Sequence, residues 1–128
     1  MTRISVARLF ALIGLVALAA CGTHLDQPRS YLVYFDTDSA ALTPAGQRIV
    51  GTIATSVHDL GPSKVIVAGR ADGSTPHDAA LADERATAVM QALAQQGVTA
   101  AKIAKEADAP PSGRSGVAAH QVVVTLLP

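Results

Sequence analysis

Residues 31–44 read YLVYFDTDSAALTP, and this stretch decides how the chain is expected to fold. Its first five side chains are Leu, Val and aromatic groups, and they end abruptly at Asp36, which is typical of a short buried β-strand. Thr43 and Pro44 then supply a hydroxyl N-cap and a proline at the first helical position, the usual start of an α-helix. A strand is therefore expected to pass into a helix across one short loop.

The chain continues this alternation of strand and helix. Apolar residues recur at three- and four-residue spacings after Pro44, and Gly61-Pro62 is expected to end this first helix. Residues 64–68 (KVIVA) predict a second strand. A long helix is expected over residues 78–96, with Gly97 as a left-handed C-cap.

Two further strands complete the expected sheet. Ile103 marks a weak third strand, residues 109–116 (APPSGRSG) form a loop by composition, and residues 121–127 (QVVVTLL) predict a strong last strand. The order strand, helix, strand, helix, strand, strand (βαβαββ) predicts an α/β (α+β) sandwich, in which two helices pack on one face of a mixed sheet.

Residues 1–20 are expected to be a lipoprotein signal peptide and not part of the fold. Arg3 and Arg8 precede an apolar run over residues 9–20, whose helix of about 18 Å is too short for a hydrocarbon core of about 30 Å. A positive start followed by a short apolar run is typical of a secretory signal. Residues 18–21 (LAAC) resemble the bacterial lipobox, which implies that Cys21 becomes the lipidated N-terminus.

Residues 21–30 are expected to be a lipidated tether that leads into a domain over residues 31–128. The stretch after Cys21 (GTHLDQPRS) is polar, contains Pro28 and shows no periodicity. The alternative is an ordinary signal peptide followed by an incidental cysteine. By resemblance to lipoproteins, Gly22 favours the outer membrane, with the domain facing the periplasm.

Composition and spacing exclude several classes of function. Ten Lys and Arg residues balance ten Asp and Glu residues, and the basic residues are scattered, whereas a nucleic-acid binder needs a basic face. The four histidines show no paired metal-ligand spacing, and one cysteine makes neither an intrachain disulfide nor a multi-cysteine metal site. No nucleophile elbow or phosphate-binding loop is present. The sequence therefore predicts no enzyme, no cofactor, no metal and no nucleic-acid partner.

Two stretches resemble the OmpA-like domain, the module of the peptidoglycan-associated lipoprotein and its relatives. Residues 33–43 (VYFDTDSAALT) are similar to the family's opening strand and loop. Residues 69–72 (GRAD) and 81–89 (LADERATAV) look like its Gly-His-Thr-Asp turn and the helix that follows, and residues 96–98 (QGV) match the helix exit. The resemblance implies a non-catalytic domain that binds peptidoglycan and links the membrane to the cell wall.

The resemblance also implies a site for the zwitterionic end of diaminopimelate in the peptide stem. Asp72 falls at the position that holds the ammonium, and Arg85 at the position that holds the carboxylate, for which a planar guanidinium is suited. Asp78 falls where the family usually has Asn, at the mouth of the helix. The alternative is structural: Asp72 would order a turn, and Arg85 would be a helix-surface residue paired with Asp78 or Asp83.

The chain departs from the family's pattern near this site. The loop between Asp72 and Arg85 is shorter, and His120-Gln121 stand where the family usually has two arginines. Arg70 replaces a histidine, and in an extended segment it would lie on the same side as Asp72 and compete with the ligand's ammonium. A second hypothesis therefore stays open: an accessory lipoprotein of this fold that contacts other proteins in an envelope or secretion assembly without binding peptidoglycan.

Overall fold

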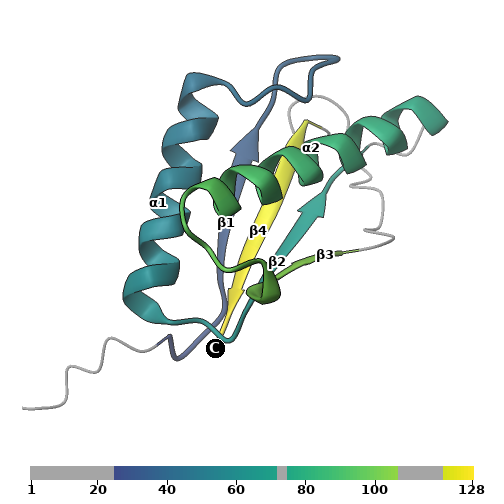
Figure 1. The fold of residues 1–128 in the computed structure, drawn as a ribbon. Helices are drawn as coiled ribbons and strands as arrows, with labels where there is room; N and C mark the ends of the chain where they lie inside the picture. Colours follow the sequence, from purple (N-terminus) through teal and green to yellow (C-terminus); the bar gives the residue numbers. More distant parts are fainter. Residues whose placement is uncertain (1–24, 72–74, 107–119) are drawn as a thin grey trace, which may run out of the picture.

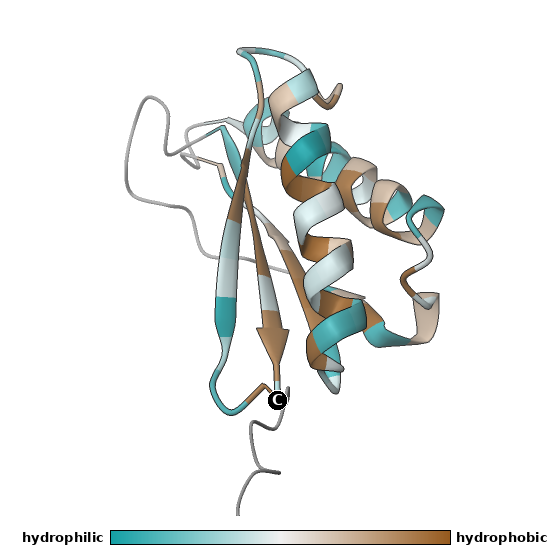
Figure 2. Ribbon diagram, turned by 90° about the vertical axis from the view of Figure 1, so that its left-hand side faces the viewer, coloured by the Kyte–Doolittle hydropathy of each residue, from teal (hydrophilic) through white to brown (hydrophobic). Residues whose placement is uncertain are grey.

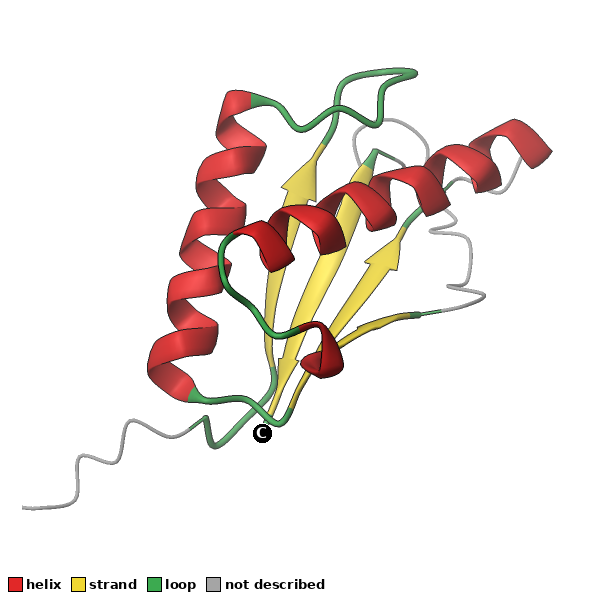
Figure 3. Ribbon diagram, in the orientation of Figure 1, coloured by secondary structure: helices red, strands yellow, loops and turns green. Residues whose placement is uncertain are grey.

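The structure, a computed structural model, describes residues 25–71, 75–106 and 120–128. These residues form four strands and two α-helices, with one short 3-10 helix (Figure 3). The elements in chain order are β1 (Arg29–Tyr34), α1 (Pro44–Leu60), β2 (Lys64–Gly69), α2 (Pro76–Gln95), η2 (Ala100–Lys102), β3 (Ile103–Lys105) and β4 (Gln121–Leu127). The predicted βαβαββ order is confirmed.

The strands form one mixed sheet in the order β1-β4-β2-β3 (Figure 1). β4 lies inside the sheet and pairs antiparallel with β1 and with β2, whereas β3 pairs parallel with β2. Tyr34 and Gly69, the last residues of β1 and β2, are therefore both opposite the start of β4, in the pairs Tyr34↔Gln121 and Gly69↔Val122. The start of β1 lies at the other end of the sheet, beside the end of β4 (Figure 1).

Both helices lie on the same side of the sheet (Figure 2). Alternate strand residues and one stripe of each helix meet in the layer between, as the two-residue and 3.6-residue periods require. The most deeply buried side chains of this core are Val33, Val50, Ile53, Val65, Val67, Val89, Leu93, Val122, Val124 and Leu126. The predicted packing of two helices on one mixed sheet is confirmed.

Both helices begin with a Thr-Pro pair, in which the threonine is the N-cap. Thr43 Oγ1 accepts a hydrogen bond from Gly46 N (3.0 Å), with Pro44 at the first helical position, as predicted. α2 begins before the predicted residue 78, because Thr75 Oγ1 accepts a hydrogen bond from Asp78 N (3.2 Å) and Pro76 follows the cap. The glycines Gly61 (φ 56°) and Gly97 (φ 90°), which follow the two helices, adopt the left-handed conformation that favours glycine.

The folded part begins earlier than the expected tether allows. β1 starts at Arg29, and Leu25 is buried with 7% of its surface exposed. Burying such an apolar side chain is favourable, so Leu25 packs on the domain, whereas the side chains of residues 26–30 are exposed. The predicted loop at residues 109–116 lies outside the described residues. No helix in the described ranges is long and apolar enough to cross a membrane.

The backbone of α2 packs directly against the backbone at the end of β2. A Cβ added to Gly69 would overlap the carbonyl group of Ala82, so glycine alone fits this position. The small side chains of Ala82 and Ala86 are buried in the same contact. This contact fixes the distance between α2 and the sheet. It therefore also fixes the position of Arg85, which lies between Ala82 and Ala86 in the sequence of α2.

Candidate functional site

Three of the predicted site residues, Arg70, Asp78 and Arg85, lie at the end of the sheet where β1 and β2 finish. The loop between β1 and α1 leaves the sheet there, and residues 70 and 71 lead from β2 towards α2 (Figure 1). Arg85 of α2 contacts that loop, and Asp78 lies in the first turn of α2. Asp72 lies outside the described residues.

Arg85 is buried, with 2% of its surface exposed, although it carries a charge. Its Nε donates a hydrogen bond to the carbonyl oxygen of Ser39 (2.7 Å), and its Nη2 donates one to the carbonyl oxygen of Asp36 (2.9 Å). The guanidinium also stands over the ring of Phe35, 5.5 Å from its centroid, which is within the range of a cation–π contact. Arg85 therefore ties α2 to the loop that follows β1.

The interpretation of Arg85 as a helix-surface residue is wrong. Its side chain points inward because two backbone carbonyls and an aromatic face replace water around the charge. Asp83, one of the two acids expected to pair with it, instead lies 2.6 Å from Lys105 Nζ on β3. Asp83 therefore forms an exposed ion pair with β3 and not with Arg85.

The two hydrogen bonds to the backbone leave three of the five N–H donors of Arg85 unused. A guanidinium has five N–H donors, and the two bonds above use Nε and one hydrogen of Nη2. Nη1 makes no hydrogen bond to a described residue. The side chain as a whole keeps only 2% of its surface exposed, so a ligand would have to reach into the site to meet Nη1. The N–H donors of Nη1 and the second hydrogen of Nη2 are those left over from the two bonds to the backbone.

Two carboxylates act on Arg85 through their charge. Burial lowers the pKa of the guanidinium from its ordinary value, and the charges of Asp38 and Asp78 oppose that shift. Asp38 is a member of the site that the sequence did not reveal. It has φ 52°, which is uncommon for a residue other than glycine, in a turn where Ser39 N donates to the carbonyl oxygen of Asp36 (3.3 Å).

Asp78 also caps its own helix. Its Oδ2 accepts a hydrogen bond from Thr75 Oγ1 (2.7 Å), while its N–H donates to the same hydroxyl oxygen (3.2 Å). A negative charge in the first turn of a helix is favoured by the helix dipole. Asp78 therefore lies in the first turn of α2, where the resemblance places it. It also has a structural role, because it bonds the N-cap residue Thr75.

The departures near the C-terminal strand lie at this same end of the sheet. Arg70 N donates to the carbonyl oxygen of Gln121 (3.0 Å), and Phe35 N donates to that of His120 (2.8 Å). These bonds extend the pairing of β4 with β1 and with β2 by one residue past the end of each of those strands. They also place His120 and Gln121 beside the site. Competition between Arg70 and a ligand for Asp72 stays a prediction, because Asp72 is outside the described residues. No cluster of His, Cys, Asp and Glu that could hold a metal ion occurs in residues 25–71, 75–106 and 120–128.

A match to a known family covers the region of this site. A family model described as "OmpA family" matches residues 34–119, about two thirds of the sequence. The chain belongs to the OmpA family. The match begins at the end of β1 and covers both helices and the whole region of Arg85. The predicted family and fold are both confirmed.

Several solved structures share the fold of this OmpA family chain. The OmpA-like domain of FopA1 from Francisella tularensis is 21% identical, with a TM-score of 0.67 over 77% of this chain and 71% of that one. The peptidoglycan-associated lipoprotein of Burkholderia pseudomallei is 23% identical (TM-score 0.60; 74% and 87% covered). The cell wall anchor of the T6SS from Pseudomonas aeruginosa is 21% identical (TM-score 0.60; 78% and 81% covered). A search of curated proteins finds no significant match.

Proposed function

We propose that this OmpA family protein binds peptidoglycan non-covalently through Asp72, Asp78 and Arg85, and that it acts by binding and not by catalysis. The observation that carries the proposal is the way in which the Arg85 guanidinium is held by the backbone. One edge of its guanidinium is fixed by two backbone carbonyls, while Nη1 makes no hydrogen bond to a described residue. A donor held rigidly before the ligand arrives loses little freedom on binding, which favours affinity.

The ligand that this arrangement suits is an amino acid centre with both charges. Its carboxylate would bond Nη1 and Nη2 in a bidentate pair, and its ammonium would face Asp72. Asp38 and Asp78, the carboxylates that act on Arg85, add negative charge near the same position. The free end of meso-diaminopimelate in the peptide stem carries these two groups side by side. Membership of the family and the fold shared with the peptidoglycan-associated lipoprotein of Burkholderia pseudomallei support this choice.

We also propose that the chain is anchored to the outer membrane through a lipid on Cys21, after removal of residues 1–20, with the domain over residues 31–128 in the periplasm. The sequence of the signal region supports the anchor. The fold supports the geometry, because the start of β1 and Arg85 lie towards opposite ends of the sheet. A lipid at Cys21 would therefore leave the site facing away from the membrane.

The test is co-sedimentation of the chain from residue 22 onward with isolated sacculi of two kinds. Diaminopimelate-type murein carries the terminal carboxylate that lysine-type murein lacks. The parent protein is expected to bind the first more tightly than the second. Arg85→Lys should reduce this preference, because lysine cannot bond a carboxylate in bidentate fashion. Arg48→Ala, a change of an exposed residue of α1, is the matched control and should leave the preference intact.

One observation favours the second hypothesis, an accessory lipoprotein that acts through protein contacts. Arg85 already satisfies two carbonyls of its own chain, so it has a structural reason to be present without any ligand. If the folded parent protein sediments with neither kind of sacculus, peptidoglycan binding is contradicted. The accessory role through protein contacts then remains as the proposed function. Equal binding by the parent protein and Arg85→Lys would instead show that the proposed site is wrong.

A further inference from the structure

β3 forms an edge of the sheet with backbone groups directed outward. Glu106 N donates to the carbonyl oxygen of Val67 on β2 (2.9 Å). Alternate residues of a parallel strand direct their backbone groups to the same side, so Ile103 and Lys105 face away from β2. The Ile103 N–H already donates to Ala100. The carbonyl group of Ile103 and both backbone groups of Lys105 make no hydrogen bond to any described residue.

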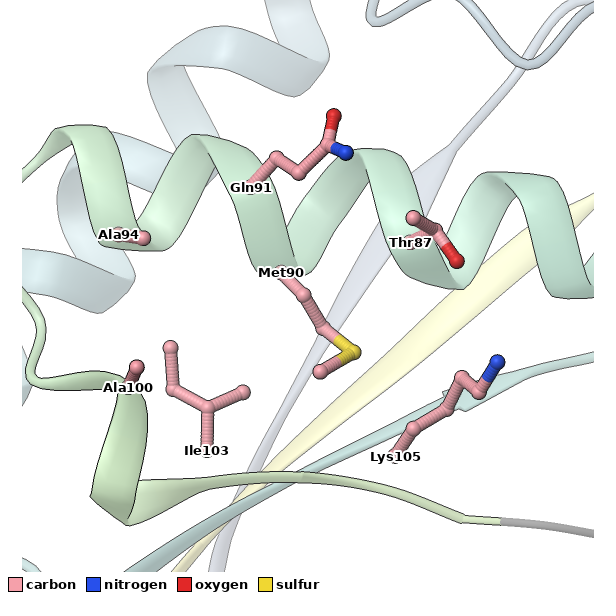
Figure 4. Close-up of a pocket in the computed structure, with 7 residues that line it drawn as sticks. All are labelled: Thr87, Met90, Gln91, Ala94, Ala100, Ile103 and Lys105. Carbon is pink, nitrogen blue, oxygen red and sulfur yellow. The ribbon is translucent and has the colours of Figure 1, made fainter.

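An apolar pocket of about 280 Å³ lies beside this edge, between α2 and β3 (Figure 4). Met90 and Ile103 point towards one another across it, and the Lys105 side chain lies at one end (Figure 4). An ion pair with Asp83 (2.6 Å) holds Lys105 in that place. The lining residues are Thr87, Met90, Gln91, Ala94, Ala100, Ile103 and Lys105.

We propose that this edge and its pocket bind an extended segment of a partner protein, which adds a strand to the sheet. Outward backbone donors and acceptors on an edge strand are complemented by the backbone of another strand. The side chains of Ile103 and Lys105 are on the same side of β3 as the pocket, so a strand beside them can insert an apolar side chain under α2. Main-chain bonds then supply affinity and the pocket supplies specificity.

Charge at the end of β3 adds a second requirement for the partner. Glu106 is exposed and makes no ion pair with a described residue, whereas the charge of Lys105 is balanced by Asp83. Opposite charges on adjacent strands attract, so the segment should place Lys or Arg beside Glu106. Successive side chains alternate between the faces of a sheet. The basic residue is therefore an odd number of positions away from the apolar one.

The experiment is a titration of the full chain, in detergent micelles, with fluorescent peptides of seven residues. Leu and Lys are placed one or three positions apart, in either order, in a background of Thr and Val. At least one of these peptides is expected to bind in a saturable manner, as measured by fluorescence anisotropy. Replacing its Leu by Asp, or methylating the backbone nitrogens that form the ladder, should weaken binding tenfold or more.

Two matched pairs of protein variants separate the contributions of the backbone and of the pocket. Lys105→Pro removes the outward N–H, whereas Lys105→Ala removes the same ion pair with Asp83 and keeps the N–H. Ala94→Glu fills the pocket, and Ala80→Glu is the control at an exposed position of α2 outside it. The first member of each pair should weaken peptide binding tenfold or more, and the second less than threefold.

Three outcomes would overturn the proposal, which does not depend on peptidoglycan binding. The first is failure of every peptide to bind the parent protein. The second is equal loss of binding in Lys105→Pro and Lys105→Ala, which would exclude main-chain pairing. The third is a concentration-dependent dimer that Lys105→Pro dissociates, because a second copy of the chain would then occupy the edge.

Discussion

The Nε atom of Arg85 lies 2.7 Å from the carbonyl oxygen of Ser39, a residue 46 positions earlier in the chain. The bond closes the loop after β1 onto α2, and the second bond from Nη2 to Asp36 holds the start of the same loop. Arg85 therefore shapes the site whether or not a ligand is bound. Changes at this residue are expected to affect stability and binding together, and the two effects need separate measurements.

Arg85→Ala is expected to lower the free energy of unfolding by about 2 kcal/mol or more, because hydrogen bonds from a charged donor contribute roughly 1.5–3 kcal/mol. Arg85→Lys should cost less, since it keeps the charge and one donor within reach. Urea denaturation of both variants measures the difference. Arg48→Ala on the exposed side of α1 serves as control and should change stability by less than about 0.5 kcal/mol. A stable Arg85→Ala would mean that the two carbonyl bonds contribute nothing.

Gly69→Ala and Gly51→Ala are the same chemical change with opposite expected effects. At Gly69 the added methyl group overlaps the carbonyl of Ala82, and overpacking of this kind costs about 1–3 kcal/mol. At Gly51, inside α1, nothing lies within 4 Å of an added Cβ, so alanine should stabilise the helix by about 0.5–1 kcal/mol. Thermal unfolding followed by circular dichroism compares the two. A melting temperature of Gly69→Ala equal to or above that of the parent protein would contradict the close approach of α2 to β2.

Arg70→His is expected to raise the affinity for a diaminopimelate-containing muropeptide by up to about fivefold. The reason is that an exposed ion pair between Arg70 and Asp72 would be worth about 0–1 kcal/mol, and the ligand would no longer have to displace it. Isothermal titration calorimetry gives the affinity, with Arg85→Ala as the variant expected to bind more weakly than the parent protein. Unchanged affinity of Arg70→His would exclude Arg70 as a competitor and leave the shortened loop as the relevant departure.

Cys21→Ala is expected to abolish incorporation of labelled palmitate in cells. Diacylation of a lipobox cysteine occurs on its sulfur atom, and the chain contains no other cysteine. Gel fluorography with a clickable palmitate analogue measures the label. Arg85→Lys, which leaves the signal region intact, should be labelled like the parent protein. Efficient labelling of Cys21→Ala would exclude the lipobox interpretation.

Local signals predicted most of the fold. Thr43-Pro44 and Gly61 marked both ends of α1, and the apolar run at residues 121–127 became β4 without a change of boundary. The start of α2 was placed too late, although Thr75-Pro76 repeats the signal that begins α1. Leu25 could not be predicted as a core residue, because one apolar side chain in a polar segment has no periodicity to detect.

The site was predictable only through its resemblance to a family, and then only in part. The resemblance marks Arg85 as a candidate, but its burial could not be inferred from α2 alone. The oxygens that satisfy its charge come from a loop 46 and 49 positions away, which no helical period encodes. Asp38 was overlooked for a related reason, since it acts on Arg85 through space and not through a motif.

The direction of β1 has a mechanical consequence for the proposed link between membrane and wall. With a lipid at Cys21 and a wall ligand at Arg85, tension would enter at the start of β1 and leave through α2 near the other end of the sheet, so β1 would be pulled along its own axis against the rest of the domain. Ladder hydrogen bonds run perpendicular to that axis, so force would shear all six β1–β4 residue pairs, from Arg29↔Leu126 to Tyr34↔Gln121, at once instead of opening them one at a time. The pairing of the short edge strand β1 with β4, and not the helices, would then set the force at which the domain yields.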